Sequence, residues 1–321
     1  MNAGVPLGLS SGLCWGAADF FGGIQSRRLP ALTVAFWSQL AGALALAIAL
    51  AIEGVRPAAT GIAWGLAAGV GSGCALVLFY RSLAEGTMSM VAPISACGAI
   101  VPVAAALLTG NQPGILAALG VLATIAGVIL VSRPHTPARF APPAVEGDQA
   151  RPASPASSAR GGRRVVAMAL GSALGFGLFY VFVDAGAAST AGTAATTGAV
   201  AAAAAGTAGS HGSPLWVIAG ARMSSLAILS MIALVSRRSA LRWPGRRLGA
   251  VALVGIGDTG ANLLFAYAAT TGNLAVVGVL GSLYPVATVV LARWLLRERL
   301  SGGQNVGVVL ALTGVVLLAA A

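Results

Sequence analysis

The chain contains 321 residues, of which 57% are hydrophobic and only 8% are charged. Soluble globular domains carry roughly 25% charged residues, so this composition excludes an ordinary soluble domain and indicates a polytopic membrane protein. The net charge is +11 at pH 7, and every basic residue is an arginine. Such a charge would suggest nucleic-acid binding in a soluble protein, so the positions of the arginines decide what the charge means.

Ten apolar segments are long enough to cross a bilayer, which requires about 20 mainly apolar residues. In chain order they are residues 5–24, 31–52, 60–80, 87–109, 114–132, 165–183, 214–235, 248–270, 274–296 and 304–321. The first segment lacks a positively charged leading region and a small-residue cleavage site, so we interpret it as a retained helix. The predicted fold class is an all-α polytopic membrane protein with ten transmembrane helices.

Two further stretches do not have the composition of a span. Residues 133–164 are rich in Pro, Ala, Ser and Arg, which is typical of a disordered linker. Residues 185–213 consist mainly of Ala, Gly, Thr and Ser and carry no formal charge. Because Ala and Gly offer little apolar area, we expect the second stretch to form an external loop, with an eleventh span as the alternative.

The arginines are distributed unevenly between the two sides of the predicted bundle. All but Arg56 and Arg222 lie in the odd-numbered connections or at the adjacent helix ends. The positive-inside rule then places the odd connections, including the linker 133–164, in the cytoplasm and both termini outside. The net charge therefore reflects orientation in the plasma membrane, and no nucleic-acid partner is predicted.

The chain also contains an internal repeat, in which residues 86–131 parallel residues 272–318. Each unit opens with a glycine, continues through a span that contains Ser and Pro, and ends in a Gly-x6-Gly pattern. The glycines of this pattern are Gly120, Gly127, Gly307 and Gly314. Five spans per half is an odd number, so the halves must insert with opposite orientation, which is the architecture of many secondary transporters.

Two segments carry a family resemblance. SLYPVATVVLARWLLRERLSGGQNVGVVLALTGVVLL resembles the end of an EamA-type repeat of the drug/metabolite transporter superfamily, and LGLSSGLCWGAADFFGGIQSRRLP resembles the first helix of that family. The resemblance implies two inverted EamA repeats of five helices each, residues 1–132 and 165–321. It also implies a carrier of small molecules, because relatives with this fold export amino acids, drugs and metabolites.

The polar turn before the last span differs between the two halves. The second half keeps the Glu-Arg typical of the family as Glu298-Arg299, whereas the first half has Asn111-Gln112 at this turn. We interpret Glu298 as a structural residue at a helix end. The substitution in the first half is therefore expected to alter packing or gating more than chemistry.

Charged residues inside spans are the best indicators of a site, because burying one costs at least ~2.5–3.5 kcal/mol on insertion scales. Asp258 has Asn262 one turn later and is a candidate to carry a proton, to attract a cationic group or to pair with Arg222. Asp19 follows Trp15 by one turn, which suits an ammonium group through charge and cation–π attraction. The alternatives are a purely structural bridge between Asp258 and Arg222, and an Asp19 that faces interfacial water.

Aromatic residues complete the candidate substrate-binding or coupling residues. They are Tyr80, Tyr180, Tyr267 and Tyr284, and each has ordinary packing as its alternative role. Laying WGAADF on FGLFYV places Tyr180 opposite Asp19, as an inverted repeat would require. Weaker polar candidates inside spans are Gln39, Ser95 and Ser282.

Small residues predict close helix packing along three spans. Gly65, Gly69 and Gly73 recur every four residues, and similar surfaces are predicted at Gly257, Gly260, Ala261, Gly278 and Gly281. Such faces serve static packing or let helices slide during transport. Prolines inside the fourth and ninth spans predict helix bends, and these are Pro93, Pro102 and Pro285.

These features favour a secondary transporter that moves an amino acid, an amine or a drug-like molecule across the plasma membrane by alternating access, with export as the expected direction. The alternatives are a non-transporting membrane scaffold or sensor, and a membrane-embedded lipid-modifying enzyme. Catalysis, a metal and a cofactor are not predicted, because both His lie outside spans and no Asp-x-x-Asp motif is present. The expected partners are a small-molecule substrate and the bilayer, and a coupling proton and the oligomeric state stay open.

Overall fold

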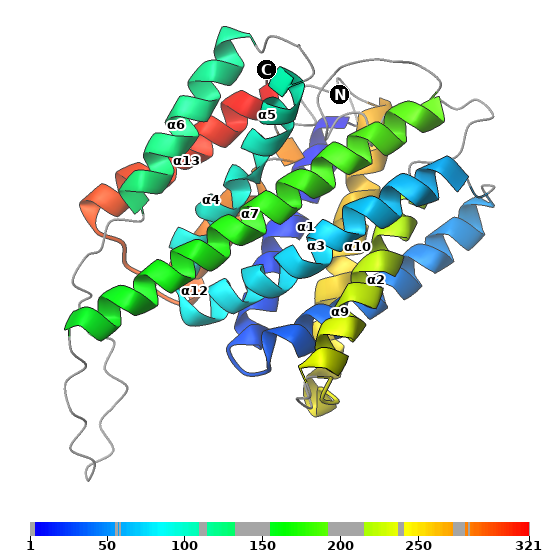
Figure 1. Cartoon of the computed structure of the whole chain (residues 1–321), viewed down its shortest axis with the longest axis horizontal. Helices are drawn as coiled ribbons and strands as arrows, with labels where there is room; N and C mark the ends of the chain where they lie inside the picture. Colours follow the sequence, from blue (N-terminus) through cyan, green and yellow to red (C-terminus); the bar gives the residue numbers. More distant parts are fainter. Residues whose placement is uncertain are drawn as a thin grey trace.

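The computed structural model describes residues 4–54, 57, 59–108, 114–131, 155–191, 215–236, 241–271, 280–281 and 283–320. Within these residues all regular structure is helical (Figure 1). The helices are α1 (Gly4–Ser26), α2 (Ala31–Glu53), α3 (Ala59–Glu85), α4 (Met88–Ala96), η1 (Cys97–Ala99), α5 (Ile100–Leu108), α6 (Ile115–Val131), α7 (Pro155–Ala191), α9 (Leu215–Val235), η2 (Gly245–Arg247), α10 (Leu248–Thr271), α12 (Tyr284–Leu295) and α13 (Gly302–Ala320).

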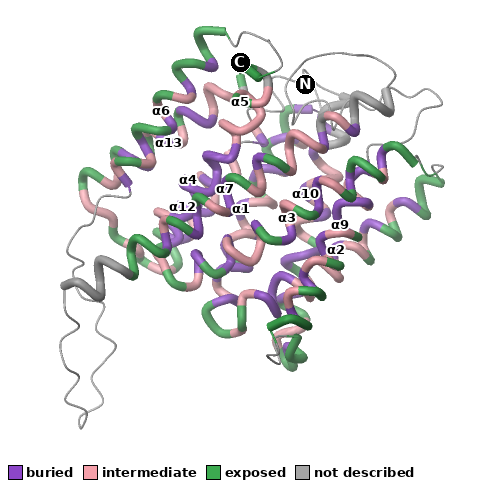
Figure 2. The backbone as a smooth tube through the Cα atoms, viewed as in Figure 1, coloured by how far each residue is buried: buried purple, intermediate pink, exposed green. Residues whose placement is uncertain are grey.

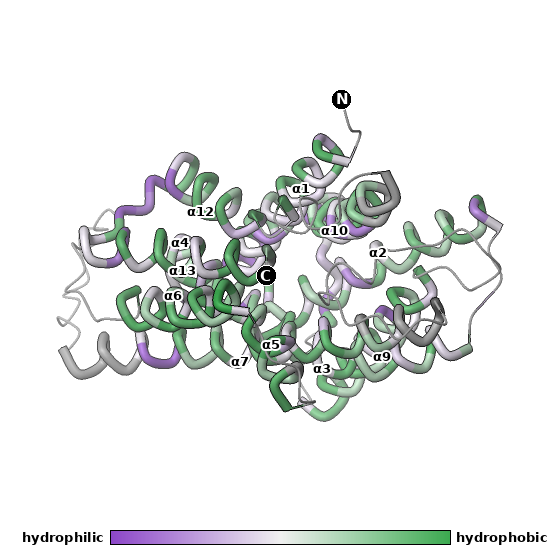
Figure 3. Tube along the Cα trace, turned by 90° about the horizontal axis from the view of Figure 1, so that it is seen from above, coloured by the Kyte–Doolittle hydropathy of each residue, from purple (hydrophilic) through white to green (hydrophobic). Residues whose placement is uncertain are grey.

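The outer surface of the bundle is apolar, as a bilayer requires. Six helices in the described residues are long and apolar enough to cross a membrane, and three shorter apolar helices accompany them. Large side chains such as Ile52, Leu108 and Leu234 are at least 80% exposed. Exposed residues cover the outside of the helices (Figure 2), and hydrophilic residues gather at helix ends such as the connection from α12 to α13 (Figure 3). The chain is therefore an integral membrane protein.

The predicted fourth span, residues 87–109, is not one regular helix. It consists of α4, a single 3₁₀ turn at η1, and α5. Pro93 lies inside α4, where it removes a backbone donor from the helical ladder, and Pro102 lies in the first turn of α5. The two prolines thus flank an interruption of the α-helix, where the Sγ of Cys97 donates to the Pro93 carbonyl, 3.1 Å away. The bend of this span stays a prediction.

Helix α7 is longer than the predicted sixth span, residues 165–183. It begins at Pro155, so residues 155–164 are helical and the predicted disordered linker 133–164 is wrong over this part. A proline suits the first turn of a helix, and no other proline follows it in the Ala/Ser/Arg-rich segment. At the other end, residues 185–191 are helical rather than part of the predicted loop 185–213, and residues 192–213 lie outside the described residues.

The ninth span was predicted over residues 274–296, with Pro285 well inside it. Helix α12 begins at Tyr284, so Pro285 occupies its first turn, where a proline costs no hydrogen bond. Residues 280–281, just before α12, are also helical, and residues 272–279 and 282 lie outside the described residues, so the bend at Pro285 stays a prediction. Gly278 and Ser282 lie outside the described residues.

The contacts between the two halves occur in matched pairs. Helix α1 packs on α10 as α7 packs on α3, and α1 packs on α12 as α7 packs on α4. Helix α2 packs on α10 as α9 packs on α3. These pairs agree with one correspondence, in which the helices of the first half match those of the second half in chain order. The fold therefore consists of two equivalent halves with extensive contacts between them.

The last helices of the two halves, α6 and α13, cross in opposite directions (Figure 1). Their repeated glycines meet crosswise, because a Cβ on Gly120 would lie 3.0 Å from the Gly314 carbonyl oxygen and one on Gly307 would lie 2.9 Å from that of Gly127. The first glycine of the pattern in each half thus contacts the second glycine of the pattern in the other half. Only residues without a side chain allow two backbones to approach this closely.

Close packing at the predicted glycine faces is confirmed for α3. A Cβ on Gly65 or Gly69 would collide with the backbone of α9 at Val217 and Ala221. For α10 the prediction is wrong at Gly257 and Gly260, because nothing lies within 4 Å of a Cβ on Gly260, and a Cβ on Gly257 would meet only Ala18 Cβ at 3.9 Å. Ala261 is fully buried, and its carbonyl accepts from the Ser11 hydroxyl of α1. Gly255, two residues before Gly257, packs on α2.

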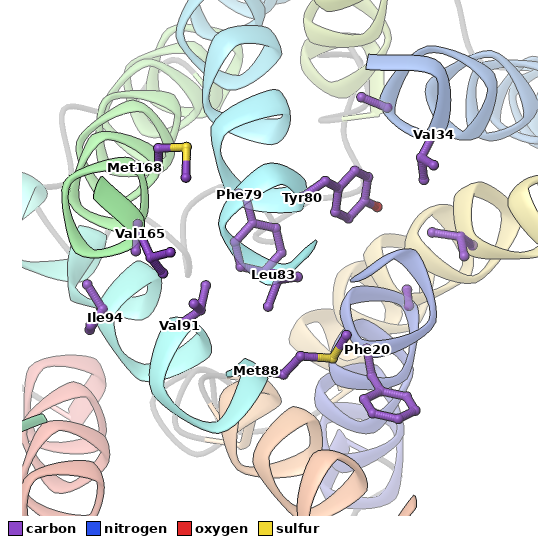
Figure 4. Close-up of a cluster of buried hydrophobic side chains, with 14 of the residues drawn as sticks. Phe20, Val34, Phe79, Tyr80, Leu83, Met88, Val91, Ile94, Val165 and Met168 are labelled. Carbon is purple, nitrogen blue, oxygen red and sulfur yellow. The ribbon is translucent and has the colours of Figure 1, made fainter. Parts of the chain in front are cut away.

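The largest buried apolar cluster lies where α1, α3, α4 and α7 converge (Figure 4). Its fully buried members include Phe20, Val34, Leu83, Met88, Val91 and Ile94. In lipid these contacts contribute through van der Waals packing, since the apolar surface does not leave water. The cluster fixes Tyr80, whose ring extends from α3 toward α2 and which is 4% exposed.

Candidate functional site

The interior of the bundle contains an ion pair between Arg222 of α9 and Asp258 of α10. The guanidinium Nη2 donates to Asp258 Oδ2. The Arg222 side chain is 9% exposed, whereas that of Asp258 is 35% exposed. The predicted pairing of these residues is confirmed, and it explains how a charged side chain is tolerated inside α9.

Arg222 also contacts residues other than Asp258. Its Nη1 donates to Gln39 Oε1 of α2 at 2.7 Å, and its Nη2 lies 3.4 Å from Thr259 Oγ1. The Thr259 hydroxyl in turn donates to the Gly42 carbonyl of α2 at 3.1 Å. Arg222 therefore links α9, α10 and α2, so the two halves meet at a buried guanidinium.

Gln39 and Thr259 were not expected to pair with Arg222. Gln39 was only a weak polar candidate, and Thr259 was not a candidate at all. The one sequence feature that points to Thr259 is that it follows Asp258 directly. The feature that points to Gln39 is its position on α2, the helix of the first half that corresponds to α9. Neither signal specifies a contact, because side-chain pairing across halves depends on helix rotation.

Asp19 of α1 lies within electrostatic range of Asp258. Tyr80, Tyr180 and Tyr284 also interact electrostatically with Asp19, and Tyr180 shares a side-chain hydrogen bond with Tyr284. These tyrosines come from α3, α7 and α12. Tyrosines from both halves thus interact electrostatically with Asp19, and the central cluster is defined here as Asp19, Tyr80, Tyr180, Arg222, Asp258 and Tyr284.

The other predicted candidates lie at the edge of the central cluster. Trp15 packs on Phe265 of α10 with ring centroids 5.5 Å apart. The Asn262 amide donates to the Asp258 carbonyl at 2.6 Å, so this donor is used within α10. Tyr267 lies in α10, and its side chain is outside the described residues. Ser95 is also engaged, sharing a 2.9 Å hydrogen bond with the Ser172 hydroxyl of α7.

A second cluster of charge lies at one end of the bundle, around Glu298. Its Oε1 accepts from the Met88 backbone N–H at 2.9 Å, and its Oε2 accepts from that of Ser89 at 2.8 Å. Arg27 of α1 completes the cluster, with Nη2 3.2 Å from Glu298 Oε1. Glu298 thus caps the N-terminus of α4, where a carboxylate is favoured by unpaired N–H groups and the helix dipole. The predicted structural role is observed, on a helix distant in sequence.

Further contacts join the odd-numbered connections at this end. Glu85 pairs with Arg81 at 2.9 Å and with Arg164 at 3.7 Å. The Trp37 indole donates to the Arg242 carbonyl at 3.3 Å. These contacts bring the arginine-rich segments of the chain to the same end of the bundle. Among the described residues, no group of three or more His, Cys, Asp or Glu is placed to hold a metal ion.

Comparison with known proteins gives a family and a fold. The sequence model of the EamA-like transporter family matches residues 2–133 and 188–320. No curated protein matches the chain. A solved structure titled only as the crystal structure of a protein superposes with a TM-score of 0.58 at 17% identity, covering 98% of this chain and 95% of that one. At this identity the likeness concerns the fold alone.

Proposed function

The chain belongs to the EamA-like transporter family, and we propose that it is a secondary transporter that exports a small organic metabolite across the plasma membrane. In this proposal the helices form ten spans, with α4, η1 and α5 together making one of them. The spans form two inverted repeats, residues 1–132 and 165–321. The odd connections face the cytoplasm and the termini face outward, in agreement with the arginine distribution.

One observation carries the proposal: charged and polar side chains from both halves converge in the interior of an apolar bundle. Arg222 and Asp258 come from the second half, and Gln39, which accepts from Arg222, comes from the first. A scaffold would gain more by filling this interface with apolar side chains, since intramembrane charge is costly. We assign the central cluster, with Trp15, Asn262 and Tyr267, to substrate binding or coupling.

Alternating access requires that each side of the site opens in turn. In the proposed orientation the cytoplasmic end is closed by the contacts of Glu298 with α4 and Arg27. Opening toward the cytoplasm would separate these groups, because they come from α1, α4 and the α12–α13 connection. The contact between halves at Glu298 is therefore the proposed cytoplasmic gate.

The test uses purified protein in liposomes loaded with a mixture of amino acids, amines and nucleobases. Mass spectrometry measures which solutes leave faster than from protein-free liposomes. We expect at least one solute to do so, and Asp258→Asn to slow it on the order of tenfold. The control is Glu85→Gln, which removes a carboxylate at the bundle end and should leave the rate unchanged. Equal leakage with and without protein would contradict the transporter function.

A further inference from the structure

Asp19 differs from the other interior carboxylate because it has no counter-charge. Asp258 is bound by Arg222, whereas Asp19 takes part in none of the ion pairs of the described chain and in no hydrogen bond there. Its side chain is half-buried. A carboxylate in this position is expensive unless a positive charge accompanies it.

The position of Asp19 on α1 is fixed by close contacts one turn before and one turn after it. The Thr288 hydroxyl of α12 donates to the Gly16 carbonyl at 3.0 Å, and the Tyr80 ring of α3 lies 2.6 Å from where a Cβ on Gly22 would be. Residues three apart share a helix face. Asp19 therefore faces the space between α12 and α3 and does not face lipid.

Aromatic residues lie on α1 near Asp19 and on the helices around it. The Tyr80 ring contacts α1 at Gly22, one turn after Asp19, and Trp15 precedes Asp19 by one turn on the same face of α1. Tyr180 of α7 and Tyr284 of α12 interact electrostatically with Asp19. The faces of Tyr and Trp rings attract cations, most strongly where water is excluded. The rings and the carboxylate thus favour the same kind of ligand.

The central cluster holds two acidic residues and one arginine. Arg222 already binds Asp258 and Gln39, so Asp19 is the acidic residue of the cluster that is left to bind a cation. An anionic substrate would have to compete with Asp258 and Gln39 for Arg222.

We propose that the substrate is an organic monocation, such as a protonated amine, and that its charge is bound by Asp19 within the ring of Tyr80, Tyr180, Tyr284 and Trp15. This inference rests on the proposed transport function and names the substrate class of the same site. The Arg222–Asp258 pair then forms one wall of the site and Asp19 its charge-recognising element.

The test compares four aromatic probes of similar size that differ in charge. Phenethylammonium and benzyltrimethylammonium are cations, N-benzylacetamide is neutral, and phenylacetate is an anion. Isothermal titration of the purified protein measures Kd for each. We expect the two cations to bind, the neutral probe to bind at least tenfold more weakly, and the anion not to bind.

Variants then connect the cation to Asp19. Asp19→Asn should raise the Kd of both cations at least tenfold, and Asp19→Glu, which keeps the charge, should restore most of the affinity. Glu85→Gln is the matched control and should not change Kd. Thermal unfolding of each variant verifies that it is folded before binding is measured.

Three results would overturn the inference. The neutral or anionic probe could bind as tightly as the cations, or neither cation could bind at millimolar concentration. Cation binding could also be unchanged in Asp19→Asn. The liposome experiment with mixed solutes tests the two proposals separately. Export of neutral or anionic solutes alone would reject the cation as substrate and leave the transporter function standing. Export of no solute would reject the transporter function itself.

Discussion

Two arginine–carboxylate ion pairs of this protein differ in which group is buried, the arginine or the carboxylate. In the interior, Arg222 is the buried group and Asp258 is 35% exposed, whereas at the bundle end Glu298 is 8% exposed and Arg27 is 33% exposed. In each pair the buried group has several partners. The partly exposed carboxylate of the interior pair can face a solute, whereas the carboxylate of Glu298 is fully occupied by backbone N–H groups and Arg27.

Under the proposed function, this difference separates a wall of the binding site from a gate contact. Glu298 holds three segments in one arrangement, which suits a gate that is either formed or broken. Arg222 orients Asp258 while leaving part of that carboxylate accessible. Depth in the membrane and the identity of the buried partner thus distinguish two pairs of the same chemistry.

The largest expected effect is that of Arg222→Met. The substitution leaves Asp258 and the Gln39 carbonyl without their donor, and breaking a buried pair from one side costs about 3–5 kcal/mol. We expect about 3 kcal/mol, since the partial exposure of Asp258 allows some solvation. Denaturant unfolding in detergent measures the loss of stability, and transport in liposomes should fall to background. A variant as stable as the wild type would contradict the assigned pairing.

A double variant separates the two roles of this pair. Arg222→Met with Asp258→Leu removes both charges, and replacing a whole buried pair with apolar residues is often neutral for stability. The double variant should therefore regain most of the lost stability while transport stays at background. Recovery of transport together with stability would show that the pair only fixes packing.

A smaller effect is expected at the bundle end for Glu298→Ala. The variant leaves the N–H groups of Met88 and Ser89 without their acceptor, and hydrogen bonds to a charged group contribute about 1.5–3 kcal/mol each. Because these N–H groups can recruit water near the helix end, we expect about 2 kcal/mol in total. The matched variant Glu298→Gln keeps an acceptor and should lose about half as much.

Transport measurements complete the comparison at Glu298. If the contact is a gate, its loss should change the transport rate while leaving the Kd of a bound solute within about twofold. The Arg222→Met variant, in contrast, should change both. A Glu298→Ala variant with an altered Kd and an unaltered rate would remove the distinction between the two pairs.

Much of the fold follows from composition and pattern. Span positions were predicted closely for α2, α9 and α10, because long apolar runs bounded by polar residues leave little choice in a bilayer. The beginning of α7 at Pro155 was missed, since an Ala/Ser/Arg-rich segment has the composition of a linker even when it continues a helix. Pro285 lies in the first turn of α12, a helix boundary that the apolar pattern of residues 274–296 does not show.

The candidate site could be predicted only in part. The pairing of Arg222 with Asp258 followed from the cost of isolated charge in a membrane, which demands a partner. The contact with Gln39 and the cap of α4 by Glu298 did not follow, because each joins residues about 180 or more positions apart through the docking of the two halves. Rotation of a helix by a single position would break the contact that this helix makes.

The smallest effect is expected for Glu85→Gln, which removes a third carboxylate that pairs with arginine. Glu85 and Arg81 lie at the bundle end with side chains 36% and 50% exposed, and Arg164 is 55% exposed. Exposed pairs of this kind contribute about 0.2–1 kcal/mol and are screened by salt. We expect a loss below about 0.5 kcal/mol that disappears at high ionic strength, measured by unfolding at two salt concentrations. A loss of stability comparable to that of Glu298→Ala would mean that burial of one partner does not set the strength of these ion pairs. The contrast between the interior pair and the Glu298 contact would then rest on their positions in the bundle alone.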